Sequence, residues 1–136
     1  MRVLKLLLDQ GVVVVCAGGG GIPVLRREDG SMVGIEAVID KDAASALLAR
    51  QLGADALLLL TDVDAVYRDF GTDQSTPLFE LTVDGARALD MPAGSMGPKL
   101  QAACDFAEAG GASGIGRLQD AVAILDGSAG TRVSVG

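Results

Sequence analysis

Two uninterrupted apolar runs place the strongest constraint on the fold of this chain. The first, at residues 12–16, is Val-Val-Val-Val-Cys, and the second, at 56–60, is Ala-Leu-Leu-Leu-Leu. Short runs without polar alternation are typical of strands that are buried on both faces of a parallel sheet. Apolar residues at helical spacing predict helices over 3–10 and between residues 40–42 and Gly53. Strands that alternate with helices indicate an α/β fold with a mostly parallel sheet flanked by helices.

The rest of the chain continues this alternation. The spacing of Leu100, Ala103, Cys104 and Ala107 predicts a helix that begins at Pro98, because proline suits the first helical position. The other expected elements are an exposed turn at 26–34, a loop at 68–77, a helix at 82–90, a weak strand at 110–116, a helix from 118 to 125 and a strand at 131–135. No linker divides the sequence, so residues 1–136 are expected to form a single α/β domain.

Composition excludes several classes of function. The net charge is −7 and no basic run exists, which argues against a nucleic-acid partner. The apolar runs are too short to span a bilayer, and Lys5 interrupts the amino-terminal one, so neither a membrane anchor nor a signal peptide is expected. We therefore expect a cytoplasmic protein. The chain has no histidine, which removes the commonest general base and metal ligand.

The pattern of the two cysteines does not indicate a disulfide or a metal site. Cys16 and Cys104 are far apart in sequence and show no CxxC spacing. This pattern favours small buried apolar side chains over a disulfide or a metal site.

Lys99 stands where simple electrostatics would not put a lysine. The amino-terminal end of a helix has a partial positive charge, so a cation there is repelled unless an anion lies in front of it. Free backbone N–H groups and a lysine behind the loop Gly94-Ser95-Met96-Gly97 are typical of a phosphate site. A solvated lysine after an ordinary Gly-Pro turn is the alternative.

Lys41 repeats this anomaly at the start of another predicted helix. Asp40 suits the N-cap and Asp42 suits the first turn, so both are explained by the helix alone. Lys41 is not explained in this way. Lys41 and Lys99 together are able to clamp a transferring phosphoryl group, with Asp42 orienting the lysines or receiving a metal ion.

Two further segments are ambiguous by themselves. The run Gly18, Gly19, Gly20 and Gly21 fits neither the dinucleotide fingerprint nor the Walker A pattern. A close approach of two backbones explains the run as well as a ligand-binding loop does. The segment from Thr61 to Asp64 offers two carboxylates for a metal ion, or simply a polar turn after a strand. No metal site is certain from the sequence. In a parallel sheet these segments and the loop before Lys99 would meet at the carboxyl ends of the strands, where ligands bind.

Taken in order, these motifs resemble the carbamate kinases, a family of the amino-acid kinase superfamily. The matching stretches cover nearly the whole chain; they are Gly18 to Val24, Glu36 to Asp42, Ala44 to Ala49, Leu60 to Tyr67, Gly94 to Lys99, and the tail from Gly116 to Arg132. The resemblance is to the C-terminal, nucleotide-binding half of the family. The sequence departs from the family pattern in a shorter segment between Leu81 and Gly94 and in a weaker strand at 113–116.

The resemblance implies reversible phosphoryl transfer between ATP and carbamate, which yields ADP and carbamoyl phosphate with Mg²⁺. It implies that Lys41 and Lys99 neutralise charge on the phosphoryl group while Asp42 organises them. The residues implied for the nucleotide pocket are Thr61, Asp62, Val63, Tyr67, Met96, Gly97 and Pro98, and Gly18 to Gly21 are candidates for a substrate loop. Phosphoryl transfer depends on positioning and charge neutralisation more than on a general base, which suits a chain without histidine.

Three alternatives remain at this stage. The chain is a phosphotransferase, a non-catalytic nucleotide-binding domain, or another amino-acid kinase that acts on a carboxylate or phosphate substrate. A nucleotide-binding half also predicts an exposed apolar surface, and therefore self-association or a homodimer.

Overall fold

The computed structural model describes residues 1–91 and 96–136 of the chain. Its centre is a four-stranded sheet in the order β3-β7-β8-β6. The strands β3 (Ala56–Thr61) and β7 (Ala112–Arg117) are parallel, as are β6 (Glu80–Thr82) and β8 (Thr131–Ser134). The contact between β7 and β8 is antiparallel. The expected α/β fold with a mostly parallel sheet is therefore confirmed, with β8 running against its neighbour β7.

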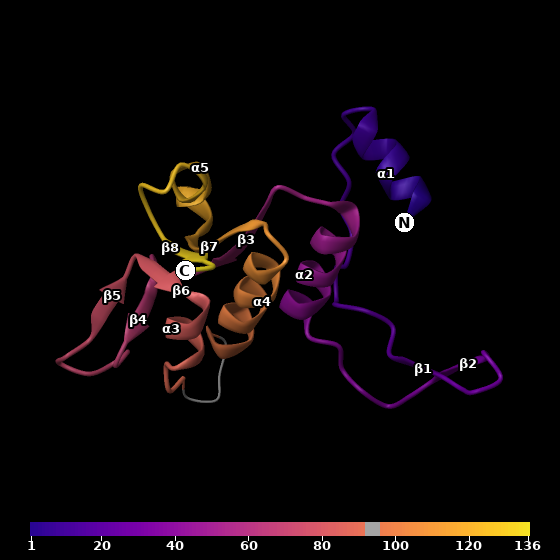
Figure 1. Ribbon diagram of the computed structural model, residues 1–136, viewed down its shortest axis with the longest axis horizontal. Coiled ribbons are helices and arrows are strands. Elements are labelled where there is room, and N and C mark those ends of the chain that lie inside the picture. Colours follow the sequence, from indigo (N-terminus) through magenta and orange to yellow (C-terminus); the bar gives the residue numbers. More distant parts are fainter. Residues whose placement is uncertain (92–95) are drawn as a thin grey trace.

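Helices cover both faces of this sheet (Figure 1). On β7, Ser113 donates a hydrogen bond to the carbonyl of Ala103 in α4 (Met96–Glu108), whereas Gly114 faces Ile124 of α5 (Ala121–Leu125). Successive strand residues point to opposite faces, so α4 and α5 lie on opposite sides of the sheet. The helix α2 (Lys41–Leu52) packs beside α4, and α3 (Val83–Arg87) packs on its other side.

The core lies between α4 and the sheet. Its members are mostly small or branched apolar side chains, which allow helix and sheet to approach closely; they include Leu59, Val66, Val83, Ala86, Leu100, Ala103, Ile115 and Val133. The expected helix stripe at Leu100, Ala103, Cys104 and Ala107 is buried, as predicted. Cys104 is buried as expected, but Cys16 is exposed, and the two thiols are free.

The weak strand expected at 110–116 is a central strand of the sheet. A Cβ atom on Gly114 would lie 2.4 Å from Ile124 Cγ2, and one on Gly116 would lie 2.7 Å from Ile124 Cδ1. The glycines therefore leave room for α5 to pack on the strand, which costs β-propensity. The residues that make the sequence look unlike a strand are those that the packing requires.

The run at 12–16 was predicted to be a buried strand, and this prediction is wrong for the described structure. Residues 12–16 are not in a strand, and Val13 and Val15 are 92% and 95% exposed. Apolar residues become a strand only where a neighbouring strand offers hydrogen bonds, and none of the strand pairings among the described residues includes this run. An exposed apolar surface, as expected, is present; Ile22 and Val38 also belong to it.

The loop expected at 68–77 also differs. It includes parts of a two-stranded antiparallel hairpin of β4 (Val66–Arg68) and β5 (Thr76–Leu78). A second hairpin, β1 (Val24–Arg26) with β2 (Met32–Gly34), brackets the turn expected at 26–34 and extends away from the body (Figure 1).

The remaining helices match their predictions closely. α1 (Arg2–Asp9) fits the helix expected at 3–10, α3 lies within 82–90, and the last helix begins as a 3₁₀ turn, η1 (Leu118–Asp120), before α5. Within the described part of the chain, no helix combines the length and apolar character needed to cross a membrane.

Candidate functional site

The starts of α2 and α4 meet at one place. α2 is joined to β3, and α4 to β7, by only three residues each, and each helix packs against the strand that it precedes. Such a helix must run back along its strand, so its amino-terminal end lies at the strand's carboxyl edge. Because β3 and β7 are parallel, both helix starts lie at the same edge of the sheet, where open α/β folds bind ligands.

Lys99 and Asp42 form a buried ion pair at this edge. The Lys99 Nζ atom donates hydrogen bonds of 3.1 and 3.0 Å to Oδ1 and Oδ2 of Asp42. Each residue is only 7% exposed. The sequence predicted an anion in front of Lys99, and in this structure the Asp42 carboxylate is that anion. A buried charge is tolerated only when it is paired in this way.

Lys41 lies on the solvent side of the same carboxylate. Its Nζ atom is 3.9 Å from Asp42 Oδ2, and its side chain is 66% exposed. Asp40 fixes the start of α2, because its side chain accepts hydrogen bonds from the backbone N–H groups of Asp42 and Ala43. Gly53, in the left-handed conformation, ends the helix as predicted. Asp42 therefore holds one buried lysine and lies beside one exposed lysine.

The glycine run reaches the same region through the backbone. At Gly20, where φ is +99°, a Cβ atom would lie 2.4 Å from the carbonyl oxygen of Ile39 and 3.6 Å from the Lys41 nitrogen. This position requires glycine because two backbones pass closely. The close approach of two backbones was one of the interpretations that the sequence left open for the glycine run. Gly21 lies against the Ile39 side chain, and Gly18 and Gly19 contact nothing that would exclude a side chain.

The residues expected to line a nucleotide pocket fall into two groups. Met96, Gly97 and Pro98 lie in the first turn of α4, with Met96 and Gly97 half-buried and Pro98 exposed. The helix already includes Met96, so it begins earlier than the expected start at Pro98. Gly94 and Ser95 lie outside the described residues.

The second group follows β3 and forms its own polar network. Thr61 donates to Asp62 Oδ1 at 3.1 Å, and the Tyr67 hydroxyl donates to Asp64 Oδ1 at 2.9 Å. Val63 is half-buried between these carboxylates. No hydrogen bond or ion pair recorded for the described residues joins this group to Lys99. Both groups lie at the carboxyl edge of the parallel strands β3 and β7.

Arg117 is a charged residue of this edge that the sequence interpretation missed. It ends β7 opposite Thr61 of β3, and its guanidinium lies 3.8 Å from Asp64 Oδ1. The hydrogen bond from Tyr67 is the main cause that lowers the pKa of Asp64, and Arg117 adds to it. The pKa of Tyr67 is raised in turn, chiefly because its hydroxyl donates to the carboxylate. An arginine at a strand end has no sequence signal of its own, so only the register reveals its place.

The described residues do not form a cage for a resident metal ion. No group of three or more His, Cys, Asp or Glu side chains suitable for a metal occurs among them. Both Asp42 oxygens already accept from Lys99, and Asp64 is engaged by Tyr67. Magnesium at kinase sites usually keeps water and is held mainly by substrate phosphates. The donor set therefore suits a metal that arrives with a nucleotide rather than one bound by protein alone.

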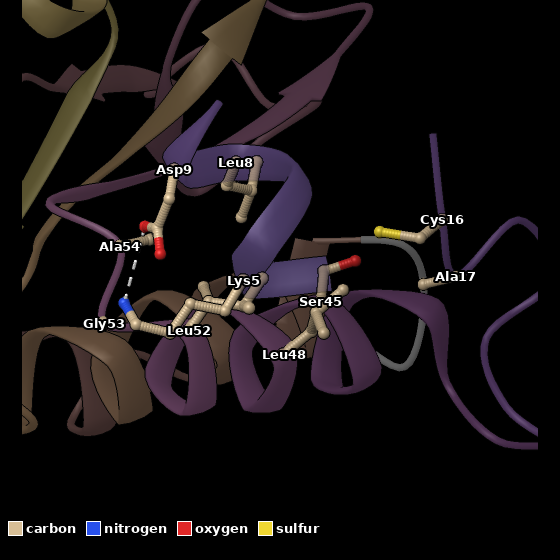
Figure 2. A pocket seen from close by; sticks show the side chains of 11 residues that line it. Lys5, Leu8, Asp9, Cys16, Ala17, Ser45, Leu48, Leu52, Gly53 and Ala54 are labelled. Carbon is tan, nitrogen blue, oxygen red and sulfur yellow. Dashed lines mark ion pairs between the residues drawn. The ribbon is translucent and has the colours of Figure 1, made fainter. Parts of the chain in front are cut away.

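Two hollows that the described residues form lie away from this edge. One, of 520 Å³, lies between α1 and α2 and is lined by Lys5, Leu8, Cys16 and Leu48 among others (Figure 2). Two of the lining residues, Lys5 and Asp9 of α1, form an ion pair at 3.9 Å. A neighbouring hollow of 530 Å³ is bordered by Leu4, Gly21 and Leu47. Both belong to the exposed apolar surface and contain none of Lys41, Asp42 and Lys99.

Known proteins resemble the chain along almost its full length. The model of the Amino acid kinase family matches residues 1–115. A carbamate kinase of Rhizobium meliloti is 46% identical over 98% of this chain, and one of Halobacterium salinarum is 49% identical over 96%. These alignments span 42% and 44% of the two relatives, so the chain is less than half as long as the curated relatives that it matches.

Solved structures give the same picture. A Giardia lamblia carbamate kinase bound to AMP-PNP superimposes with a TM-score of 0.90 and 41% identity, over 99% of this chain and 49% of that one. A Neisseria gonorrhoeae N-acetylglutamate synthase, at 21% identity and a TM-score of 0.69, shares the fold alone. The resemblance that the sequence motifs indicated is confirmed.

Proposed function

The chain belongs to the amino acid kinase family, and we propose that it supplies the nucleotide-binding part of a carbamate kinase-type phosphotransferase. The reaction would be reversible transfer of a phosphoryl group between ATP and carbamate, giving ADP and carbamoyl phosphate. The observation that carries the proposal is the buried Lys99 ammonium at the start of α4, which donates two hydrogen bonds to the Asp42 carboxylate. The names of the carbamate kinase relatives support the choice of substrates.

Phosphoryl transfer requires a positive charge at a fixed position beside the transferring group. In phosphoryl transfer, charge spreads over the equatorial oxygens of the transferring group, and the protein contributes mainly positioning and electrostatic stabilisation. Lys99 meets this demand because Asp42 fixes its ammonium through two of the three N–H groups, and among the described residues no other acceptor is bonded to it. A cation that is already in position avoids most of the reorganisation cost at the moment of reaction.

Lys41 and the helix starts complete the charge arrangement. The exposed Lys41 ammonium is free to close on the phosphates, while the first N–H groups of α2 and α4 point toward the same edge. Magnesium would enter with the nucleotide and shield its phosphates. We propose that the Thr61–Tyr67 segment, with Met96, Gly97 and Pro98, binds the nucleoside, and that Gly18 to Gly21 border the substrate.

The test compares two of the three lysines of the chain. We expect Lys99→Ala to reduce ATP formation from carbamoyl phosphate and MgADP by about 10²–10³-fold, the usual cost of a lost electrostatic contact to the transition state. Lys5→Ala removes the lysine on α1, away from the edge, and is the matched control. Near-normal turnover of Lys99→Ala, in a preparation whose unmodified chain is active, would refute the proposed role.

A second candidate function is nucleotide binding without catalysis. It is favoured by the length of the chain, which spans less than half of the carbamate kinases that it matches. Calorimetry with MgADP separates the two candidates. Binding together with turnover supports the phosphotransferase, binding without turnover supports the second candidate, and absence of binding refutes both. Turnover with another carboxylate or with a phosphate substrate in place of carbamate would assign the chain to a different amino-acid kinase activity.

A further inference from the structure

Tyr67 is held in place at both ends of its side chain. Its hydroxyl donates to Asp64 Oδ1 at 2.9 Å, and its ring meets the ring of Phe70 with centroids 5.8 Å apart at 61°. This edge-to-face arrangement is a favoured geometry for aromatic pairs. The chain contains only three phenylalanines and one tyrosine, so half of its aromatic side chains meet at this corner.

The turn that brings Phe70 to Tyr67 is conformationally costly. Asp69, between the two, has a φ of +53°, in the left-handed region, which is uncommon outside glycine although aspartate adopts it more often than most residues. The Asp69 carbonyl accepts hydrogen bonds from the Thr72 nitrogen at 3.2 Å and from the Thr72 hydroxyl at 2.8 Å, which lock this turn. Phe70 remains 69% exposed, so burial of its ring does not repay the strain. A strained backbone that holds an exposed aromatic ring points to a role in binding.

The backbone beneath Tyr67 is fixed as well. The N–H of Val66 donates to Thr131 Oγ1 at 2.7 Å, and that hydroxyl donates to the carbonyl of Leu78. Thr131 is fully buried in β8. It therefore ties the β4–β5 hairpin to the central sheet. The ring of Tyr67 is set on a rigid base, close to the carboxyl end of β3.

We propose that Asp64 and Phe70 are positioning residues that hold the Tyr67 ring as a flat surface for the base of a nucleotide. Asp64 fixes the hydroxyl end and Phe70 fixes the ring edge, so the ring keeps one orientation before the ligand arrives. Arg117, 3.8 Å from Asp64, restrains that carboxylate from the side of β7. Holding the ring in advance reduces the entropy lost on binding. The proposal rests on nucleotide binding as the proposed function.

The pKa directions agree with this geometry. The hydrogen bond between Tyr67 and Asp64 is the main cause that raises the pKa of the phenol and lowers that of the carboxyl. The Arg117 charge acts on both groups in the opposite sense to burial, lowering the pKa of each.

The first test needs no ligand. Tyr67 is the sole tyrosine and the chain has no tryptophan, so absorbance at the tyrosinate band and tyrosine fluorescence report this ring alone. We expect Asp64→Asn to move the titration midpoint of Tyr67 down toward the ordinary value of about 10. We expect Phe70→Ala to lower the fluorescence anisotropy of Tyr67. The matched controls Asp73→Asn, in the same hairpin, and Phe79→Ala, another exposed phenylalanine, should change neither quantity.

The second test measures MgADP affinity by calorimetry. Asp64→Asn and Phe70→Ala should each raise the Kd about three- to tenfold, as expected for the loss of one aromatic or hydrogen-bonded support. An unchanged titration midpoint and anisotropy would overturn the positioning of the ring. Changed spectra with an unchanged Kd would overturn its role in base binding. If the unmodified chain fails to bind MgADP, the proposed function fails, while the ligand-free spectra still decide whether Asp64 and Phe70 hold the ring.

Discussion

Removing Asp42 alone from the Lys99–Asp42 pair should cost more stability than removing both partners. The perturbations are Asp42→Asn, Lys99→Met and the double variant. Asp42→Asn leaves the Lys99 ammonium, 7% exposed, without the carboxylate that accepts two of its hydrogen bonds. Lys99→Met is milder, because Asp42 keeps Lys41 at 3.9 Å on its solvent side. The structure thus predicts an order of effects as well as their size.

The magnitude follows from distance and burial. Two unit charges about 3 Å apart attract by about 5 kcal/mol at the effective dielectric constant of 20 that suits protein sites. Desolvation of both ions offsets much of this attraction in the intact pair, whereas a single buried ion keeps its desolvation cost without the attraction. We expect about 3–5 kcal/mol for Asp42→Asn and about 1–3 kcal/mol for Lys99→Met. The double variant should cost less than Asp42→Asn alone.

Urea unfolding of the four proteins, followed by far-ultraviolet circular dichroism, measures these free energies. The quantity that decides is the coupling energy of the double-mutant cycle, expected to be at least about 2 kcal/mol. A coupling below about 0.5 kcal/mol, with the two single effects simply adding, would refute the argument. It would mean that Lys99 and Asp42 do not depend on each other in the folded chain.

Three other predictions concern the second polar network, the central strand and the exposed surface. Folding raises the pKa of Tyr67 through its hydrogen bond to Asp64, so the stabilisation from this bond is complete below about pH 10 and is lost as the pH rises through the folded-state pKa. The urea midpoint should therefore fall more steeply above about pH 10 in the unmodified chain than in Tyr67→Phe. Parallel curves for the two proteins would count against the hydrogen bond. Gly114→Ala should lower the free energy of unfolding by about 1–3 kcal/mol, because its Cβ atom would lie 2.4 Å from Ile124 Cγ2; an unchanged urea midpoint would show that α5 moves away without cost. The exposed apolar surface should cause self-association that Val15→Ser weakens, and sedimentation that shows only monomers at high concentration would contradict this.

Local sequence patterns predicted most of the elements and their chemistry. The helix over Lys41–Leu52, its Asp40 cap and its Gly53 end follow from hydrogen-bonding preferences of residues close in sequence. The buried stripe of α4 follows from helical spacing, and β3 from its apolar run. The unexpected position of Lys99 at a helix start predicted an anion beside it; the structure shows the Asp42 carboxylate there, and a bound phosphate stays a prediction.

Sequence patterns gave wrong or missing predictions where the structure depends on a segment that is distant in sequence. Residues 12–16 have the composition of a buried strand, but a strand also needs a hydrogen-bonded partner, and the described sheet does not offer one to this run. The opposite error occurred at β7, whose glycines weaken the local signal while Ile124 of α5 fills the space above them. Arg117 was missed for the same reason, since only the β3–β7 register brings it beside Asp64.

The sequence by itself determined the α/β alternation, the helix caps, the family and the pair of lysines that no helix would favour. These depend on residues within a few positions of one another, where propensity and hydrogen bonding act directly. Only the tertiary structure decided that the Asp42 carboxylate, expected to orient the lysines, lies within hydrogen-bond distance of Lys99, 57 positions away in sequence. It also decided that Tyr67 is supported by Asp64 and Phe70, and that Gly114 and Gly116 belong to the centre of a sheet. Burial and pairing are properties of surfaces that meet in space, so they are set by which elements pack together rather than by local sequence.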